Sequence, residues 1–318
     1  MTHKVSPAQT WWTFAITSLA LFMVTLDNLV VTTALPVIRK DLHAGISGLE
    51  WTVNAYTLTF AVLLLTGAAL GDRFGRRRLF AIGIFIFTAA SAAAALAPTI
   101  GVLDAARAVQ GLGGAIVMPL TLTILSAAVP EERRGVFLGA WGGISGLAVA
   151  FGPLVGGAVV SGFSWHWVFW LNVPVGIALL ALVPRLAETK GPFGRVDLAG
   201  LVLASGGLFG IVWGLVRGNS VGWGSAEIVG ALVAGALVTA LFVAIDDEWA
   251  RASIRELASA GVVSGETGAA GLAGLLALLT GPDQEKRRQT LDLTPDSRVV
   301  VISTEGATDP DAYQQIVG

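Results

Sequence analysis

The sequence predicts an all-α integral membrane protein, and three observations carry this prediction. Of its 318 residues, 54% are hydrophobic and only 13% are charged, whereas a soluble domain has about 25% charged residues. Glycine (40 residues) and tryptophan (10 residues) are abundant, as expected for close helix packing and interfacial anchoring in lipid. Eight apolar runs approach the length of roughly 20 residues that a bilayer span needs. The lipid bilayer is therefore the first expected partner, and the net charge of −2 argues against nucleic acid.

The eight runs follow one another with short links that hold Gly, Pro or charged residues, as helix breaks should. They are residues 12–35, 51–70, 79–97, 103–129, 136–160, 167–184, 198–216 and 228–245. The first run lacks a small-residue cleavage site, so we expect a retained helix and not a signal peptide. The sequence contains no cysteine and therefore predicts no disulfide and no thiolate metal site.

Positive charges in the short loops predict the orientation of the spans. The segments on the side of the N-terminus carry ten Lys or Arg residues, whereas the opposite loops carry three, Arg39, Lys40 and Arg217. Because positively charged loops stay inside, the sequence predicts a multi-pass protein of the cell membrane. Its N-terminus and its residues 246–318 are expected in the cytoplasm.

One acid lies deep in the first run. Asp27 is about halfway along it, where lipid excludes a carboxylate unless that group faces a cavity or a partner. Thr25, Asn28 and Thr32 form a polar stripe beside it. Desolvation favours the protonated form of a carboxylic acid, so we interpret Asp27 as a proton-coupling residue. The alternative is a structural hydrogen-bonding group between helices.

A charged turn links the second and third runs. It reads Gly71-Asp72-Arg73-Phe74-Gly75-Arg76-Arg77-Arg78. Glycine permits a tight reversal, an aspartate can accept hydrogen bonds from helix-end amides, and arginines hold a loop at the anionic inner leaflet. This run resembles the signature loop of the major facilitator superfamily, although Ala68 stands where that pattern often has glycine. The resemblance implies a conformational role for Gly71, Asp72, Arg73, Gly75, Arg76 and Arg77.

The fourth run begins with a second match. Leu103-Asp104-Ala105-Ala106-Arg107-Ala108-Val109-Gln110-Gly111 resembles the fourth-helix motif of the same superfamily, in which the arginine is thought to take part in proton transfer. The resemblance gives that role to Arg107, with Gln110 and Gly111 as motif residues. The spacing equally permits an ordinary pair within the helix between Arg107 and Asp104, and the sequence leaves both readings open.

The fifth run carries a third match, and small residues dominate it. Gly152, Pro153, Gly156 and Gly157 resemble the antiporter motif, which the superfamily associates with exporters. Small residues also permit close helix approach in any membrane protein, and a proline kinks a helix. Generic packing does not explain three motifs in the family's order, so we favour the resemblance.

Two further segments are similar to the fourteen-helix drug:proton antiporters, namely the element around Leu26-Asp27 and residues 165–174. The resemblance implies a six-helix half over 1–184 and two additional helices over 185–245. It also implies amphipathic small-molecule substrates, protons as partners and a proton gradient as the energy source, with no cofactor and no metal. A second six-helix half does not come after them, so we expect a truncated chain or a separately encoded C-terminal half.

The last segment, 246–318, is predicted to be a short α/β-like tail with a strand near 298–303. Residues 262–271 and 299–306 resemble the C-terminal end of pyridoxal-phosphate lyases of the diaminopropionate ammonia-lyase kind. That resemblance would place Ser303 or Thr304 near the ring nitrogen of the cofactor. The lysine of such an enzyme would lie upstream, where the membrane runs are, and roughly 70 residues cannot form its core. We therefore expect a remnant that binds no cofactor.

The sequence favours a transporter and not an enzyme, with proton-coupled efflux of drugs or other amphipathic molecules as its function. One alternative is a non-functional fusion or split-gene product that cannot transport alone. A less favoured alternative is a membrane-anchored fragment of a pyridoxal-phosphate lyase.

Overall fold

The computed structural model describes residues 7–191 and 198–259, and every regular element within these ranges is helical. By its contacts the chain divides into two compact units, residues 1–238 and 239–318. The first unit contains the first seven predicted runs and the beginning of the eighth. The tail predicted to be α/β-like, with Ser303 and Thr304, falls beyond residue 259 and thus outside the described residues.

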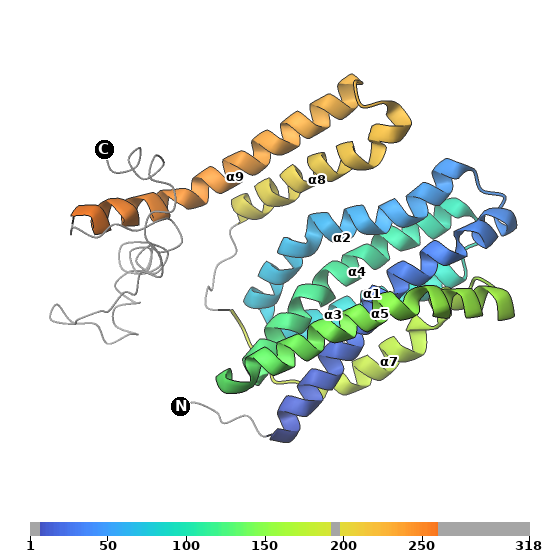
Figure 1. Ribbon diagram of the computed structural model, residues 1–318, viewed down its shortest axis with the longest axis horizontal. Coiled ribbons are helices and arrows are strands. Elements are labelled where there is room, and N and C mark those ends of the chain that lie inside the picture. The colour runs from blue at the N-terminus through green and yellow to red at the C-terminus, as the bar shows by residue number, and fades with distance from the viewer. Residues whose placement is uncertain (1–6, 192–197, 260–318) are drawn as a thin grey trace. The chain divides into compact units, whose positions relative to one another are not determined.

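The helices begin and end close to the predicted runs (Figure 1). In chain order they are α1 (Pro7–Asp41), α2 (Ile46–Phe74), α3 (Arg76–Ala95), α4 (Ile100–Ala128), η1 (Glu131–Arg133), α5 (Arg134–Gly162), α6 (Trp167–Trp170), α7 (Asn172–Leu182), η2 (Val183–Arg185), α8 (Leu198–Val221) and α9 (Ala226–Ser259). The sixth predicted run is thus interrupted at Leu171 and finishes in a 3-10 turn.

Seven stretches of the described chain are long and apolar enough to cross a membrane, with α6, α7 and η2 forming one of them. The eighth predicted span is represented by Ala226–Ala240, an apolar stretch shorter than the others. Its helix does not end at residue 245 as predicted, because α9 continues to Ser259. The acidic residues after 245 end the apolar pattern, but Glu, Ala, Arg and Leu in the next part of the sequence are all good helix formers.

Helix α4 lies at the centre of the first six-helix group. It packs against α1, α2 and α3, and α1 in turn packs against α5 (Figure 1). Buried aromatic and aliphatic side chains of α3 and α4, including Phe80, Phe87, Val117 and Leu120, form a core between them. Since α4 packs mainly against three helices, polar side chains on it can reach all three at one level.

Glycines explain why α4 approaches its neighbours so closely. A Cβ atom on Gly113 would lie 2.6 Å from the backbone nitrogen of Phe87, and one on Gly67 would lie 2.6 Å from the carbonyl oxygen of Ala115. Any side chain at these positions would push α4 away from α3 or α2. Such small residues are how helices pack tightly in lipid, where burial of apolar surface between helices supplies little driving force.

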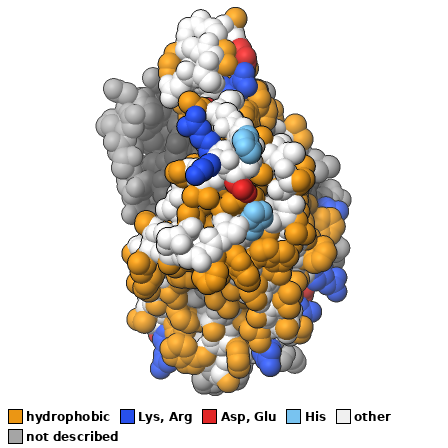
Figure 2. Space-filling view, turned by 90° about the vertical axis from the view of Figure 1, so that its right-hand side faces the viewer, with side chains coloured by type: hydrophobic (Ala, Val, Ile, Leu, Met, Phe, Trp, Pro, Cys, Tyr) orange, Lys and Arg blue, Asp and Glu red, His pale blue; other side chains and the backbone are white. Residues whose placement is uncertain are grey.

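The outward surface is strongly apolar. Figure 2 shows hydrophobic side chains covering a broad band of the visible face, while charged and histidine side chains gather in a few places. Large apolar side chains such as Phe85, Leu154 and Val202 are more than half exposed. A soluble protein rarely leaves so much contiguous apolar surface in water, so this surface fits contact with lipid chains.

Candidate functional site

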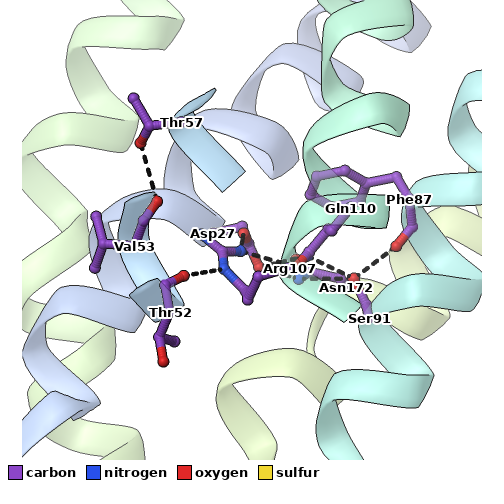
Figure 3. Close-up of polar contacts among 9 residues, drawn as sticks. All are labelled: Asp27, Thr52, Val53, Thr57, Phe87, Ser91, Arg107, Gln110 and Asn172. Carbon is purple, nitrogen blue, oxygen red and sulfur yellow. Dashed lines mark hydrogen bonds and ion pairs between the residues drawn. The ribbon is translucent and has the colours of Figure 1, made fainter. Parts of the chain in front are cut away.

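The candidate site is a buried ion pair between α1 and α4. Nη1 of Arg107 lies 2.6 Å from Oδ2 of Asp27, and both side chains are fully enclosed (Figure 3). The two residues proposed for proton coupling from separate motifs are therefore direct partners. The sequence had offered Asp104 as the partner of Arg107, and that reading is wrong. Oδ1 of Asp104 instead accepts a hydrogen bond from Oγ1 of Thr52 at 2.8 Å.

Two amides complete the surroundings of the Asp27 carboxylate. Nε2 of Gln110 on α4 donates to Oδ1 of Asp27 at 2.9 Å, and Nδ2 of Asn172, at the start of α7, donates to the same oxygen at 2.6 Å. Both amide nitrogens also lie within hydrogen-bond distance of Oγ of Ser91 on α3, at 2.8 and 3.3 Å. Oγ of Ser91 donates in turn to the carbonyl oxygen of Phe87 (Figure 3).

The guanidinium of Arg107 is held by further contacts. Its Nε donates to the carbonyl oxygen of Thr52 on α2 at 3.1 Å, and its Nη1 donates to Oε1 of Gln110 at 2.8 Å. Its carbon Cζ lies 4.3 Å from the ring centroid of Tyr56, a cation–π arrangement. Nη2 has no hydrogen-bond partner within the described part of the chain. Arg107 therefore ties α4 to both α1 and α2.

Gly111 makes this geometry possible. A Cβ atom at this position would lie 2.5 Å from the carbonyl oxygen of Tyr56, so only glycine lets α4 come this close to α2. One turn earlier on α4, the same close approach brings the carbonyl oxygen of Thr52 within reach of Arg107. The packing role of Gly111 therefore supports the polar contacts of the motif arginine.

The buried charges of Asp27 and Arg107 lower the stability of the protein unless the two residues remain paired. Removing one partner of a buried ion pair leaves an uncompensated charge and costs about 3–5 kcal/mol. Side chains or carbonyls from α1, α2, α3, α4 and α7 converge here (Figure 3). A change in the charge of Asp27 would therefore be felt by five of the helices.

The signature loop forms the connection between α2 and α3. Gly75 has φ of +112°, a conformation that favours glycine, and it separates the two helices. Oδ1 of Asp72 accepts a hydrogen bond from Nε of Arg76 at 2.7 Å. The acceptor role predicted for Asp72 is thus filled by an arginine side chain and not by helix-end amides. Arg73 lies over the ring of Phe74 at 5.3 Å.

A residue that sequence reasoning missed holds this loop. Oε1 of Glu188 accepts a hydrogen bond from the backbone nitrogen of Arg77 at 3.0 Å, in the first turn of α3. Its other oxygen lies 3.7 Å from Nε of both Arg77 and Arg78. The carbonyl oxygen of Thr189 accepts from the backbone nitrogen of Arg76 at 2.9 Å. The segment after η2 therefore caps the start of α3, where a negative charge is favourable.

The four antiporter-motif residues divide into two pairs. Gly152 and Gly156 are buried against α1, where a Cβ atom on Gly152 would lie 2.6 Å from Cβ of Leu29. Pro153 and Gly157 are exposed, and nothing lies within 4 Å of a Cβ atom on Gly157. Gly152 and Gly156 bring α5 close to the helix that carries Asp27.

Asn172 and Ser91 also escaped the sequence reasoning. Asn172 was noted only within a segment of family resemblance, and Ser91 lies in a long run of alanines. Both are buried polar side chains in apolar helices. A polar residue that lipid disfavours is the signal that could have found them.

Comparison with known proteins identifies the family of this chain. The Major Facilitator Superfamily model matches residues 17–287, which reaches beyond residue 245, where the predicted transporter part ends. The tetracenomycin C resistance and export protein of Streptomyces glaucescens is 37% identical over 235 residues, covering 73% of this chain and 44% of that protein. The puromycin resistance protein pur8 of Streptomyces alboniger is 39% identical over 240 residues, covering 74% and 47%.

The cephamycin export protein CmcT of Amycolatopsis lactamdurans is 40% identical over 254 residues, covering 78% of this chain and 52% of that protein. The chain thus spans about half the length of the curated relatives it matches. Among solved structures, a peptide transporter POT in complex with sulfate aligns with a TM-score of 0.52 at 19% identity, covering 78% of this chain and 53% of that one.

At that identity the structural likeness establishes the fold alone. The family match covers most of the sequence, and its known members and structural neighbours are transporters. With its signature loop, its buried Asp27–Arg107 pair and its multiple spans, the chain belongs to the Major Facilitator Superfamily.

Proposed function

We propose that this chain supplies one six-helix half, residues 1–184, and two further helices, 185–245, of a proton-coupled exporter of drugs or other amphipathic small molecules. The names of its relatives, which refer to export of or resistance to tetracenomycin C, puromycin and cephamycin, support export. Because the family is one of transporters, we do not propose an enzyme.

The observation that carries the proposal is the enclosed Asp27–Arg107 pair at 2.6 Å. While Asp27 is ionised, its charge balances that of Arg107 and it accepts hydrogen bonds from Gln110 and Asn172. A proton on Asp27 removes that balancing charge and leaves Arg107 as an uncompensated buried cation. Relief of this cost by a shift of α1 against α4 and α7 is a way to couple proton uptake to helix movement.

Transport by alternating access rocks one repeat against another around a site near the middle of the bilayer. We therefore expect export to require a second six-helix half in addition to residues 1–245. The positive loops place its N-terminus and its C-terminal segment in the cytoplasm in this proposal. Protons entering from outside would then drive the exit of substrate.

The test measures export driven by a pH gradient. A fluorescent amphipathic cation is added outside inside-out vesicles that contain the chain together with a second six-helix half, and its uptake is followed when a gradient is imposed. We expect Asp27→Asn to abolish the gradient-dependent part while the amount of inserted protein stays normal. Asp104→Asn is the matched control, since Asp104 bonds Thr52 and takes no part in the pair. Unchanged gradient-driven uptake in Asp27→Asn would reduce Asp27 to a packing role.

A further inference from the structure

The hydrogen bonds around Asp27 all run in one direction. The groups that reach its oxygens are the guanidinium of Arg107 and the amide nitrogens of Gln110 and Asn172, and all three are donors (Figure 3). Donors stabilise a carboxylate but offer nothing to the O–H of a carboxylic acid. The arrangement therefore suits ionised Asp27, and a proton added to it would face no acceptor.

Two of the neighbouring polar groups cannot turn to supply that acceptor. Oε1 of Gln110 accepts from Nη1 of Arg107 at 2.8 Å, so reversing this amide would set Nε2 against the guanidinium. The hydroxyl hydrogen of Ser91 is committed to the carbonyl oxygen of Phe87 at 2.8 Å, which leaves Oγ of Ser91 to accept from the amides. Both orientations are thus fixed by a second partner.

Asn172 differs in this respect. Its Nδ2 binds Oδ1 of Asp27 and Oγ of Ser91, but within the described residues its Oδ1 accepts no hydrogen bond. Rotation of the amide by half a turn would replace the donor Nδ2, 2.6 Å from Asp27, with the acceptor Oδ1, and it would give up the long contact of 3.3 Å to Ser91. An amide carries both a donor and an acceptor of nearly equal shape, so this exchange needs no change in volume.

We propose that Asn172 is a positioning residue for the proton on Asp27: its amide nitrogen holds the carboxylate, and its amide oxygen accepts the hydrogen bond of the carboxylic acid. This inference rests on the proposed function. The charged or titratable groups that face the site are Arg107 on α4 and Tyr56 on α2, with Asp104 one turn from Arg107. The groups contributed by α3 and α7 are neutral.

The position of Asn172 in the chain can couple the change of its hydrogen-bond partner to a movement of the backbone. It is the first residue of α7, directly after the interruption of the sixth span at Leu171. The residue is buried, with 5% of its surface exposed. A change of partner here acts on the end of a helix, where backbone rearrangement is least restricted.

The test follows the protonation of Asp27 without requiring transport. Dicyclohexylcarbodiimide reacts with protonated buried carboxyl groups, and mass spectrometry of the purified full chain measures the labelled fraction of Asp27 from pH 5 to pH 9. Asn172→Leu removes both the donor to the carboxylate and the acceptor for the carboxylic acid. Because the hydrogen bond to the charged form is the stronger of the two, the half-labelling pH should rise by about one unit. Asn172→Asp keeps the shape and adds a second acid, so its half-labelling pH should rise further.

Thr88→Val is the matched control. Thr88 is buried on α3 one turn from Ser91, and its hydroxyl donates to its own helix at Ile84. The control should keep the wild-type half-labelling pH even where it lowers the melting temperature. If Asn172 had a merely structural role, its variants would behave in the same way: the melting temperature would fall and the half-labelling pH would not change. If Asn172→Leu fails to insert, the smaller Asn172→Ala, which also removes the amide, takes its place.

If labelling of Asp27 varies with pH in the wild type and both Asn172 variants have the same half-labelling pH as the wild type, this inference is overturned, but the proposed coupling role of Asp27 is not. Labelling of wild-type Asp27 that does not vary with pH overturns the proposed coupling role of Asp27 and this inference with it. The two failures are therefore distinct.

Discussion

Nη1 of Arg107 and Oδ2 of Asp27 lie 2.6 Å apart although the residues are 80 positions apart in the sequence. The contact joins α1 to α4 at a level from which water is excluded. In such surroundings a charge without its partner is costly, so each residue depends on the other for both stability and function.

We expect Arg107→Leu to destabilise the protein by about 3–5 kcal/mol, because it leaves the Asp27 carboxylate buried without a counter-charge. The double variant Asp27→Asn with Arg107→Leu should lose less than the sum of the two single variants. Thermal unfolding in detergent measures the four proteins of this double-mutant cycle.

The exposed pair of Arg217 and Glu227, at 3.0 Å, supplies the control for that cycle. Its side chains are 30% and 44% exposed, and exposed pairs contribute about 0–1 kcal/mol. Arg217→Leu should therefore be nearly neutral. Additive losses for Asp27 and Arg107 would contradict the coupling that the geometry implies.

We expect Glu188→Ala to loosen the signature loop. The variant removes the acceptor for the backbone nitrogen of Arg77 and the negative charge beside Arg78. A lost helix-capping contact costs about 0.5–2 kcal/mol, and partly exposed ion pairs add little. Limited proteolysis at the arginines of the loop should become faster, with a modest fall in melting temperature.

Glu188→Gln tests which part of that contact matters. Glutamine keeps an acceptor for the amide of Arg77 but loses the charge, so it should lie between wild type and Glu188→Ala. The exposed Glu132, replaced by alanine, should leave proteolysis of the loop unchanged. Equal cleavage rates for wild type and Glu188→Ala would refute the capping role.

The two kinds of glycine in the antiporter motif should respond oppositely to alanine. Gly152→Ala places a Cβ atom 2.6 Å from Leu29 and should cost about 1–3 kcal/mol through overpacking of α5 against α1. Gly157→Ala meets nothing within 4 Å and should be neutral or stabilising, since alanine is the better helix former. Melting temperatures of the two variants check the prediction, and similar losses at both positions would contradict it.

The predicted orientation can be read with reporter fusions. A reporter placed after residue 259, where α9 ends, should be active on the cytoplasmic side, and one in the loop at residues 222–225 should be active outside. The reason is the excess of positive charge in the loops assigned to the cytoplasm. An external signal after residue 259 would overturn this topology.

The lyase-like tail yields a separate prediction. Purified full chain should show no pyridoxal-phosphate absorbance, because the lysine and the sheet of such an enzyme would fall where the membrane helices are. Removal of residues 260–318 should leave membrane insertion unchanged. Stoichiometric binding of the cofactor that disappears on this truncation would revive the enzyme alternative.

The sequence by itself determined the class of the protein and the positions of its spans. Apolar runs predicted the ends of α1 to α5 to within six residues, because lipid demands a continuous apolar stretch whatever the helix packs against. It also marked Asp27, since a charge in an apolar run is visible without any structure, and it marked Arg107 through the resemblance to the fourth-helix motif. The predicted end of α9 at residue 245 was wrong, because acidic residues interrupt an apolar stretch without ending the helix.

Only the tertiary structure decided which residues are partners. Local spacing made Asp104 as good a partner for Arg107 as any, whereas packing of α4 against α1 gave it Asp27. The packing of the helices also brought Asn172 into contact with the Asp27 carboxylate, and the course of the chain after η2 placed Glu188 against the first turn of α3. Hydrophobicity is a property of each segment, but a contact between distant segments depends on which helix faces fit together, and glycines such as Gly111 set that fit.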